Sequence, residues 1–206
     1  MVGGSAVTDA VERLIDLVLS GVAATVTAPL VAVLALAIRL ESPGSPIYTQ
    51  SRVGRDGRLF AIYKLRTMVH GAEFTGARLA LAEGDDRITR VGALLRRYSL
   101  DELPNLWNVL RGDMSIVGPR PTLQVQVQQY TEHQRRRLEV KPGITGWAQV
   151  NGRASVPWSQ RIELDLYYIE HRSLWLDLKI LVRTLAMLLA GGEIYKGEHG
   201  GWEGEL

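Results

Sequence analysis

The longest uncharged stretch of this chain is the feature that most constrains its fold. Residues 17–38 read LVLSGVAATVTAPLVAVLALAI, which is 22 residues without a charged side chain. As one α-helix the stretch would measure about 33 Å at ~1.5 Å per residue, and the apolar core of a bilayer is roughly 30 Å thick. A soluble helix of this length rarely lacks a polar face. The residues before it are mixed in charge and no cleavage site ends it, which argues against a signal peptide. The sequence therefore predicts insertion into a membrane.

Pro29, near the middle of this stretch, leaves two arrangements open. A proline removes one backbone hydrogen bond and bends the helix. Residues 17–28 and 30–38 would measure only about 18 and 14 Å at ~1.5 Å per residue, so neither half crosses a bilayer alone. A re-entrant helix, which enters and leaves by one face, competes with a kinked spanning helix. The positive-inside tendency places the chain beyond this helix in the cytoplasm, because the next basic residues are Arg39, Arg52, Arg55, Arg58, Lys64 and Arg66.

Composition excludes several classes of protein. At 206 residues the chain is long enough for about one domain. Its 24 basic and 22 acidic side chains leave a charge of only +2, which argues against a protein that mainly grips nucleic acid. The absence of cysteine excludes disulfides, thiolate catalysis and cysteine-ligated metals, and the scatter of the four histidines argues against a histidine metal cage.

The remaining pattern predicts an α+β protein with a small, mainly helical domain. Short strands are expected at residues 47–50 and 59–63, as a hairpin around Gly54 and Gly57. The C-terminal stretch is basic and amphipathic, with Trp175, and suits either a membrane interface or ordinary core packing. Helices are expected over residues 69–83, 90–97, 123–138, 165–169 and 174–189. We therefore expect a re-entrant membrane helix, kinked at Pro29, over residues 1–41, a cytoplasmic domain over residues 42–190 and a flexible tail over residues 191–206.

Two adjacent carboxylates, Asp101 and Glu102, lie where the charged residues concentrate. The Ser-x-x-Glu spacing from Ser99 to Glu102 is that of a capping box, which predicts a helix from there to about Leu110. Arg111 and Gly112 mark its end. A helix start among arginines suits a phosphate, and an aspartate there can bind Mg²⁺ or attack phosphorus. Ordinary helix capping is the alternative reading of the same two residues.

Several contiguous blocks resemble the bacterial sugar transferases, the small monotopic phosphoglycosyl transferases that act on polyprenyl phosphate. The central block is the most specific, because it matches many adjacent positions. Residues 86–92 and 165–170 fit the same pattern, and the similarity covers about residues 10 to 190. The matching blocks are KLRTM at residues 64–68, SLDELPN at residues 99–105, NVLRGDMSIVGPRP at residues 108–121 and KPGITGW at residues 141–147.

This resemblance implies a reaction and a mechanism. Sugar-1-phosphate passes from a UDP-sugar to undecaprenyl phosphate, UMP is released, and glycan assembly begins at the cytoplasmic face of the bacterial inner membrane. Asp101 would be the nucleophile that forms a covalent aspartyl-phosphosugar, and Glu102 would assist as a Mg²⁺ ligand or acid/base partner. An aspartyl-phosphate divides one difficult transfer into two easier steps. Asp101 and Glu102 are thus the expected catalytic and metal-binding residues, with Mg²⁺ as cofactor.

The resemblance also implies substrate contacts and partners. Arg96 matches an arginine near the nucleotide, and Arg120 is held between Pro119 and Pro121, where it could clamp a phosphate. Lys64 and Arg66 are expected beside the phosphate path. The family often breaks its membrane helix at Ser-Pro, whereas this chain has Ala28-Pro29, with Thr25 or Thr27 as substitutes for the serine. The expected partners are the UDP-sugar, undecaprenyl phosphate and membrane lipid, without nucleic acid, and a homo-oligomer stays open.

Two other functions remain in view. The same acidic and basic groups would serve a Mg²⁺-dependent phosphodiesterase or nucleotidyl transferase, which would hydrolyse the donor without lipid. A membrane scaffold of polysaccharide assembly would show no turnover, although the intact Asp101-Glu102 pair argues against it. No motif specifies the sugar.

Overall fold

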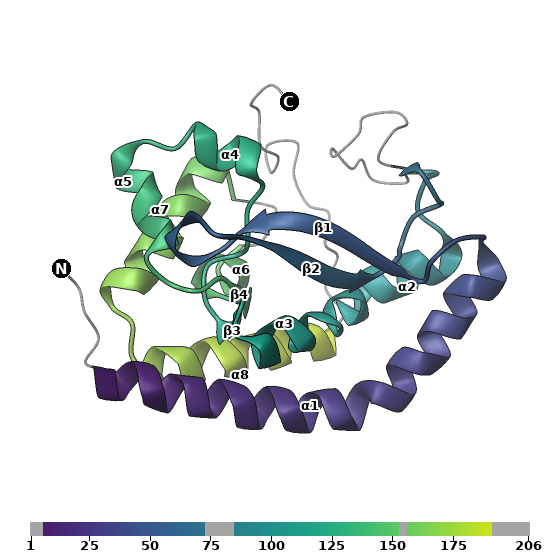
Figure 1. Ribbon diagram of the computed structural model, residues 1–206, viewed down its shortest axis with the longest axis horizontal. Helices are drawn as coiled ribbons and strands as arrows, with labels where there is room; N and C mark the ends of the chain where they lie inside the picture. Colours follow the sequence, from purple (N-terminus) through teal and green to yellow (C-terminus); the bar gives the residue numbers. More distant parts are fainter. Residues whose placement is uncertain (1–5, 73–84, 153–155, 191–206) are drawn as a thin grey trace.

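The computed structural model describes residues 6–72, 85–152 and 156–190 (Figure 1). It confirms the mixture of helices with small sheets. The predicted tail over residues 191–206 and most of the helix predicted over residues 69–83 lie outside the described residues, and residues 69–72 form a turn. The elements are α1 (Ala6–Glu41), β1 (Ile47–Val53), η1 (Arg55–Gly57), β2 (Leu59–Leu65), α2 (Arg90–Arg97), η3 (Leu100–Glu102), α3 (Asn105–Arg111), β3 (Ser115–Val117), α4 (Gln124–Gln128), α5 (Glu132–Arg135), η4 (Arg136–Leu138), β4 (Gly143–Thr145), α6 (Trp147–Val150), α7 (Trp158–Glu170) and α8 (Leu174–Ala190).

The uncharged stretch forms part of one long helix, α1, with Pro29 inside it. In the described part of the chain, α1 is the one helix long and apolar enough to cross a membrane, with a mean hydropathy of 2.2. Only 6% of its most apolar 18-residue segment is buried, so α1 is not the core helix of a soluble protein. Its ribbon bends in the second half (Figure 1).

The threonines before Pro29 do not serve the carbonyl that the proline leaves without an amide. That carbonyl belongs to Thr25, four residues earlier. The Thr25 and Thr27 hydroxyls instead donate to the carbonyls of Gly21 and Ala23, at 2.8 and 2.7 Å. Hydrogen bonds of this kind, from a threonine hydroxyl to the carbonyl four residues earlier, favour a bend in a helix. The two threonines therefore do not replace the hydrogen bond that Pro29 removes.

The N-terminal part of α1 is tied to the rest of the molecule by polar contacts. Arg13 donates to the carbonyls of Val109 and Leu110, at 2.6 and 2.8 Å. These bonds pair carbonyls in the last turn of α3 that have no partner within the helix. The Asp16 carboxylate accepts from the Ser115 hydroxyl at 3.0 Å and from the Ile116 amide at 2.9 Å. These contacts hold the first half of α1 against α3 and β3.

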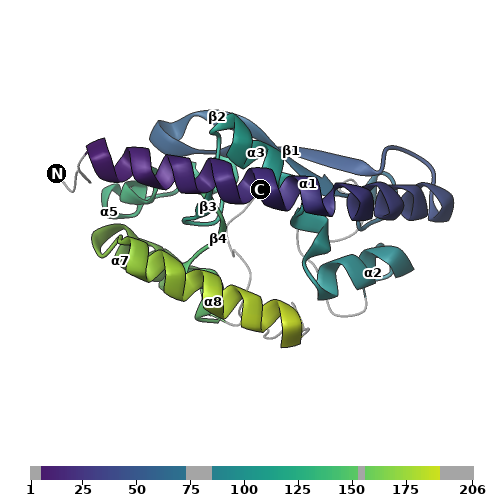
Figure 2. The same cartoon turned by 90° about the horizontal axis from the view of Figure 1, so that it is seen from below.

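The C-terminal part of α1 is tied to the same domain by apolar packing and by a cap. Ile38 is buried and packs with Leu65 of β2 and Leu95 of α2. The Glu41 carboxylate accepts from the amides of Arg90 and Val91 and so caps α2. Both ends of α1 therefore contact the domain, and the helix runs along its underside, in front of the other elements in the view from below (Figure 2).

The predicted hairpin forms, and each strand is longer than expected. β1 and β2 pair antiparallel from Ile47 opposite Leu65 to Val53 opposite Leu59. The turn η1 contains Asp56 in a left-handed conformation (φ 57°) next to Gly57. Val53 also bridges to Thr122, which joins the end of the hairpin to a loop that carries Arg120.

A second small sheet lies under that loop. β3 and β4 pair in parallel, with Ser115 opposite Gly143 and Val117 opposite Thr145. Gly118 and Gly143 approach so closely that a Cβ atom on either one would collide with the backbone of the other. Residues 141 and 142 lead directly into β4, which begins at Gly143.

The polar helix predicted over residues 123–138 is wrong as a single element. It divides into α4, α5 and η4, because Thr131 starts a new helix as its cap. The Thr131 hydroxyl accepts from the Gln134 amide, and the Gln134 side chain accepts from the Thr131 amide. The capping box at Thr131 therefore starts a new helix there, although the whole segment is polar and favours helix.

The helices predicted near the C-terminus are confirmed, and α7 begins earlier than expected. The main apolar core lies between α7, α8 and the small sheet, around Ile162, Leu166 and Ile180. An ion pair is buried in it, between Arg137 Nε and Asp165 at 2.6 Å. Arg137 also donates to the Tyr130 hydroxyl at 2.6 Å and to the Arg120 carbonyl at 2.8 Å.

We expect Asp165→Ala to lower the free energy of unfolding by about 3–5 kcal/mol, because the substitution removes the carboxylate that pairs with the buried Arg137 charge. Chemical denaturation of the purified protein in detergent measures the change. The matched control is Glu163→Ala on the same helix, where the exposed side chain pairs with His133 at 3.4 Å. That control should change the free energy by less than about 0.5 kcal/mol. Equal effects of both variants would contradict a stabilising role for the buried pair.

Candidate active site

The adjacent carboxylates lie in a short turn between two helices, and the predicted capping box is wrong. Ser99 has φ 54° and its side chain makes no capping bond. It follows the end of α2 so closely that the chain must reverse there, and its amide donates to the Arg96 carbonyl at 3.1 Å. Asp101 and Glu102 belong to η3, and α3 starts only after Pro104. The end predicted for α3 is confirmed, at Gly112 with φ 89°.

Glu102 is the centre of the charged cluster. Its Oε1 atom accepts from Lys64 Nζ and from Arg120 Nη2, each at 2.7 Å. The side chains of Lys64 and Glu102 are only 18% and 16% exposed, while that of Arg120 is half-exposed. Burial opposes ionisation of Glu102, but Arg120 and Lys64 outweigh it and hold the pKa of this carboxyl below its ordinary value. Glu102 is therefore a permanently charged anchor for two cations.

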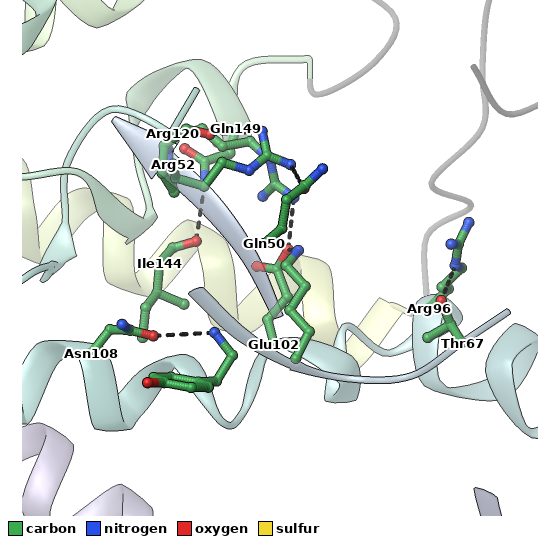
Figure 3. A network of polar contacts seen from close by, with 12 residues as sticks. Gln50, Arg52, Thr67, Arg96, Glu102, Asn108, Arg120, Ile144 and Gln149 are labelled. Atoms are coloured by element: carbon green, nitrogen blue, oxygen red, sulfur yellow. Dashed lines mark hydrogen bonds and ion pairs between the residues drawn. The ribbon is translucent and has the colours of Figure 1, made fainter. Parts of the chain in front are cut away.

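The position of Lys64 is set by β2 and by a buried asparagine of α3. Asn108 donates to the Ala61 carbonyl at 2.7 Å and accepts from the Tyr63 amide at 3.3 Å (Figure 3). These bonds fix β2 against α3, so that Lys64 reaches the turn that carries Glu102. Burial lowers the pKa of Lys64, and the Glu102 charge opposes that shift.

Asp101 differs from Glu102 in its contacts. Among the described residues, the Asp101 carboxylate makes no hydrogen bond or ion pair. Burial and the neighbouring Glu102 charge raise the pKa of Asp101, against the nearby cations Lys64 and Arg120. A carboxylate with a raised pKa and without a partner is more basic than an ordinary aspartate, and it is free to attack or to bind a metal.

The loop that carries Arg120 is rigid. Pro119 and Pro121 flank Arg120, and the Pro119 carbonyl accepts from the Gly143 amide at 2.9 Å. The buried Arg137 holds the carbonyl of Arg120 itself. The Glu102 carboxylate raises the pKa of Arg120, so this guanidinium stays charged.

The other two predicted substrate residues lie apart from Glu102. Arg96 of α2 donates from Nε to the Thr67 hydroxyl at 2.8 Å, and Figure 3 shows both away from Arg120. Arg66 is buried and donates to the carbonyls of Ser42 and Pro43, so it fastens the chain after α1. The structure therefore brings together Lys64, Arg120 and the two carboxylates, and it leaves Arg66 outside this cluster.

Three residues that the sequence did not single out shape the site. Asn108 positions β2, Arg137 holds the Arg120 loop, and Arg52 lies near Arg120 with Gln50 (Figure 3). Arg52 and Gln50 alternate along β1, which places them on one face of the strand. That alternation was the one available signal, because the contacts of Asn108 and Arg137 join segments far apart in the sequence.

The carboxylates also fit a magnesium ion that the substrate helps to bind. Among the described residues no group of three or more acidic or histidine side chains could hold a metal ion. Mg²⁺ commonly binds through one or two carboxylates together with substrate phosphates and water. The Asp101 carboxylate and the Oε2 atom of Glu102 offer that donor set, since Oε1 is occupied by Lys64 and Arg120.

A sequence profile described as bacterial sugar transferase matches residues 7–191. The chain belongs to the bacterial sugar transferase family. This confirms the resemblance seen in the sequence, and the matched range covers α1 as well as the whole charged cluster. The residues of the cluster are therefore features of a sugar transferase fold rather than of an unrelated phosphate-binding protein.

Three relatives show how far the similarity extends. The sugar transferase EpsL of Bacillus subtilis is 47% identical over 157 residues, which is 76% of each chain. A UDP-glucose:undecaprenyl-phosphate glucose-1-phosphate transferase of Caulobacter vibrioides is 46% identical over 193 residues, 89% of this chain and 72% of its own. A UDP-N-acetylgalactosamine-undecaprenyl-phosphate N-acetylgalactosaminephosphotransferase of Aeromonas hydrophila is 42% identical over 187 residues, 88% of this chain but only 44% of its own. Relatives of this sugar transferase thus differ in both length and sugar.

Proposed function

We propose that this sugar transferase moves sugar-1-phosphate from a UDP-sugar to undecaprenyl phosphate and releases UMP, as the first membrane step of glycan assembly. The observation that carries the proposal is the Asp101 carboxylate, which has no hydrogen bond or ion pair among the described residues, beside Glu102, which Lys64 and Arg120 hold at 2.7 Å. The names of the Caulobacter and Aeromonas relatives support it, since each gives a UDP-sugar donor and an undecaprenyl-phosphate acceptor.

The chemistry proceeds in two displacements at one phosphorus. In the first, an Asp101 oxygen bonds to the β-phosphorus of the UDP-sugar, and the bond from that phosphorus to the bridging oxygen breaks. UMP leaves with the bridging oxygen. In the second, a phosphate oxygen of undecaprenyl phosphate bonds to the same phosphorus and the aspartyl bond breaks. No proton is consumed, the carboxylate is regenerated, and the two substrates need not be bound together.

The surrounding charges prepare both displacements. Lys64 and Arg120 provide positive charge where diphosphate charge accumulates, and Glu102 keeps both cations in place. The raised pKa of Asp101, from burial and the Glu102 charge, makes it a better nucleophile than an ordinary aspartate. Asp101 and Glu102 Oε2 would hold Mg²⁺, which when bound neutralises charge on the diphosphate.

We further propose that α1 is re-entrant and that the domain lies on the cytoplasmic face of the inner membrane. Contacts near both ends support this, because Arg13 and Asp16 bind α3 and β3 while Glu41 caps α2. A helix that spanned the bilayer would carry one end away from the domain. Exposed apolar side chains follow α1 and one face of α8, and both helices lie at the lower side of the molecule in Figure 1. The exposed residues of α8 are Leu174, Trp175, Leu178, Val182, Leu185 and Leu189.

A labelling experiment tests this topology. The chain has no cysteine, so single cysteines at Ser5, just before α1, and at the exposed Ser159 of α7 report on their own sides. We expect a membrane-impermeant thiol reagent to label neither variant in intact cells and both variants in inside-out vesicles. Labelling of the position 5 cysteine from outside, with position 159 protected, would establish a spanning helix.

The proposed reaction is tested by UMP release from a panel of UDP-sugars, with and without undecaprenyl phosphate. We expect sustained release only with the lipid, and with a subset of the sugars. Sustained hydrolysis without lipid would indicate the phosphodiesterase alternative. The absence of release from every donor would indicate a scaffold.

A further inference from the structure

Arg52 is a half-buried cation near the active site. Its Nη2 atom donates to Gln50 Oε1 at 2.5 Å, and Nη1 makes a long contact of 3.5 Å to the Pro121 carbonyl. Its Nε atom is buried without a hydrogen-bond partner, and no carboxylate pairs with it in the described parts of the chain. Buried arginines that serve structure normally meet a carboxylate or several carbonyls.

The backbone places Arg52 where it must face the active site. Tyr48 lies opposite Lys64 in the hairpin, and alternate residues share a face, so Arg52 is on the same face as Lys64. The next residue, Val53, donates its amide to the Thr122 carbonyl at 2.9 Å. This bond fixes Arg52 beside the loop that carries Arg120, and Figure 3 shows the two side chains together.

The charges at this place do not balance. Lys64, Arg120 and Arg52 supply three positive charges, whereas Glu102 and Asp101 supply two negative charges at most. Burial and then the Arg120 charge lower the pKa of Arg52 to about 10, because both disfavour the charged guanidinium. A bound anion would offset both effects, and a planar guanidinium is well suited to a phosphate.

We propose that Arg52 and Arg120 together form a phosphate subsite beside the Asp101-Glu102 pair. The ligand is a phosphate group, either in the diphosphate of the donor or in the phosphate of the lipid acceptor. Gln50 orients the Arg52 guanidinium without neutralising it, so its charge remains for the ligand. The assignment to a substrate rests on the proposed function, and the subsite itself can be tested without turnover.

The direct test measures binding of inorganic pyrophosphate, with magnesium chloride present, to the purified protein by calorimetry. We expect Arg52→Met to raise Kd at least tenfold and Arg52→Lys to raise it less, because lysine keeps the charge but loses the planar fork. The matched control is Arg55→Met, at the exposed turn of the same hairpin, which should leave Kd within twofold. Equal Kd values for the wild type and Arg52→Met would overturn the subsite. If Arg52→Met lowers the unfolding temperature, Arg52→Lys carries the test, and an unchanged Kd there has the same meaning.

Two kinetic arms identify the source of the phosphate. The first arm measures the rate of the single release of UMP without lipid. If Arg52→Met raises the UDP-sugar concentration that half-saturates this rate tenfold, the subsite belongs to the donor. A tenfold rise in KM for undecaprenyl phosphate, with the donor unaffected, assigns it to the acceptor. A fall in kcat with both constants unchanged would overturn the proposal. If the wild type releases no UMP but pyrophosphate binding still depends on Arg52, the proposed function fails and the subsite stands.

Discussion

Asp101→Asn is expected to lower sugar-1-phosphate transfer by at least about a thousandfold, because an amide keeps the shape of the side chain but cannot act as the nucleophile. The fold should survive, since Asp101 makes no hydrogen bond or ion pair among the described residues. Release of UMP in the presence of undecaprenyl phosphate measures the loss, and the unfolding temperature checks the fold.

The control for this substitution is Asp113→Asn, just past the end of α3. Asp113 is a half-buried aspartate that pairs only loosely with Arg111, at 3.5 Å. It should retain transfer within about twofold of the wild type, as surface changes away from a site usually do. Transfer by Asp101→Asn within tenfold of the wild type would show that another group attacks the phosphorus.

Glu102→Gln is expected to lower transfer by about a hundredfold or more, a loss typical of removing one electrostatic contact from an active site. Without the Glu102 charge, Lys64 and Arg120 lose their shared anchor. They are then free to pair with Asp101 instead, which neutralises the nucleophile. The rate of UMP release measures the loss, and Glu139→Gln is the matched control at an exposed pair with Arg136.

The pH profile of Glu102→Gln separates this electrostatic role from a structural one. Asp101 attacks as a carboxylate, so the rate falls as pH falls through its pKa. Burial and Glu102 raise that pKa in the wild type, and its acid limb lies at a higher pH than an ordinary aspartate gives. Removing the Glu102 charge should move the acid limb to lower pH. An acid limb that stays in place or moves upward would contradict the proposed coupling.

Local patterns in the sequence were sufficient for the elements that local physics decides. The uncharged stretch predicts α1, because its length and hydropathy admit few other structures. The hairpin follows from alternation around Gly57, and the end of α3 follows from Gly112, whose φ of 89° favours glycine. The breaks within residues 123–138 were also encoded locally, in the Thr131 capping box, but the uniform polarity of the segment concealed them.

Contacts between distant segments could not be predicted in the same way. Ser99 looks like a cap in the sequence, yet its place directly after the C-cap of α2 forces it into a left-handed turn. Arg66 and Arg52 are both basic residues near the hairpin. The folded structure shows that Arg66 binds Ser42, just after α1, while Arg52 lies beside the loop that carries Arg120.

The sequence predicted which charged residues form the candidate site, but it did not predict how they pair. The sequence supplied Lys64, Asp101, Glu102 and Arg120, and the fold brings them together through β2, η3 and the loop after β3. Within the described part of the chain both cations pair with Glu102 and neither pairs with Asp101, and this depends on distances that no motif contains. The roles of Arg96, Pro119 and Pro121, the magnesium ion and a homo-oligomer stay predictions.

The intact mass of the protein after incubation with a UDP-sugar alone tests the covalent mechanism most directly. With a donor that supports transfer, the wild type should gain the mass of one phosphosugar and release about one equivalent of UMP, because the first displacement needs no lipid. Undecaprenyl phosphate should remove the added mass, and Asp101→Asn should never acquire it. Sustained transfer to the lipid by a wild type that shows neither added mass nor early UMP would contradict the mechanism and indicate direct attack by the lipid phosphate.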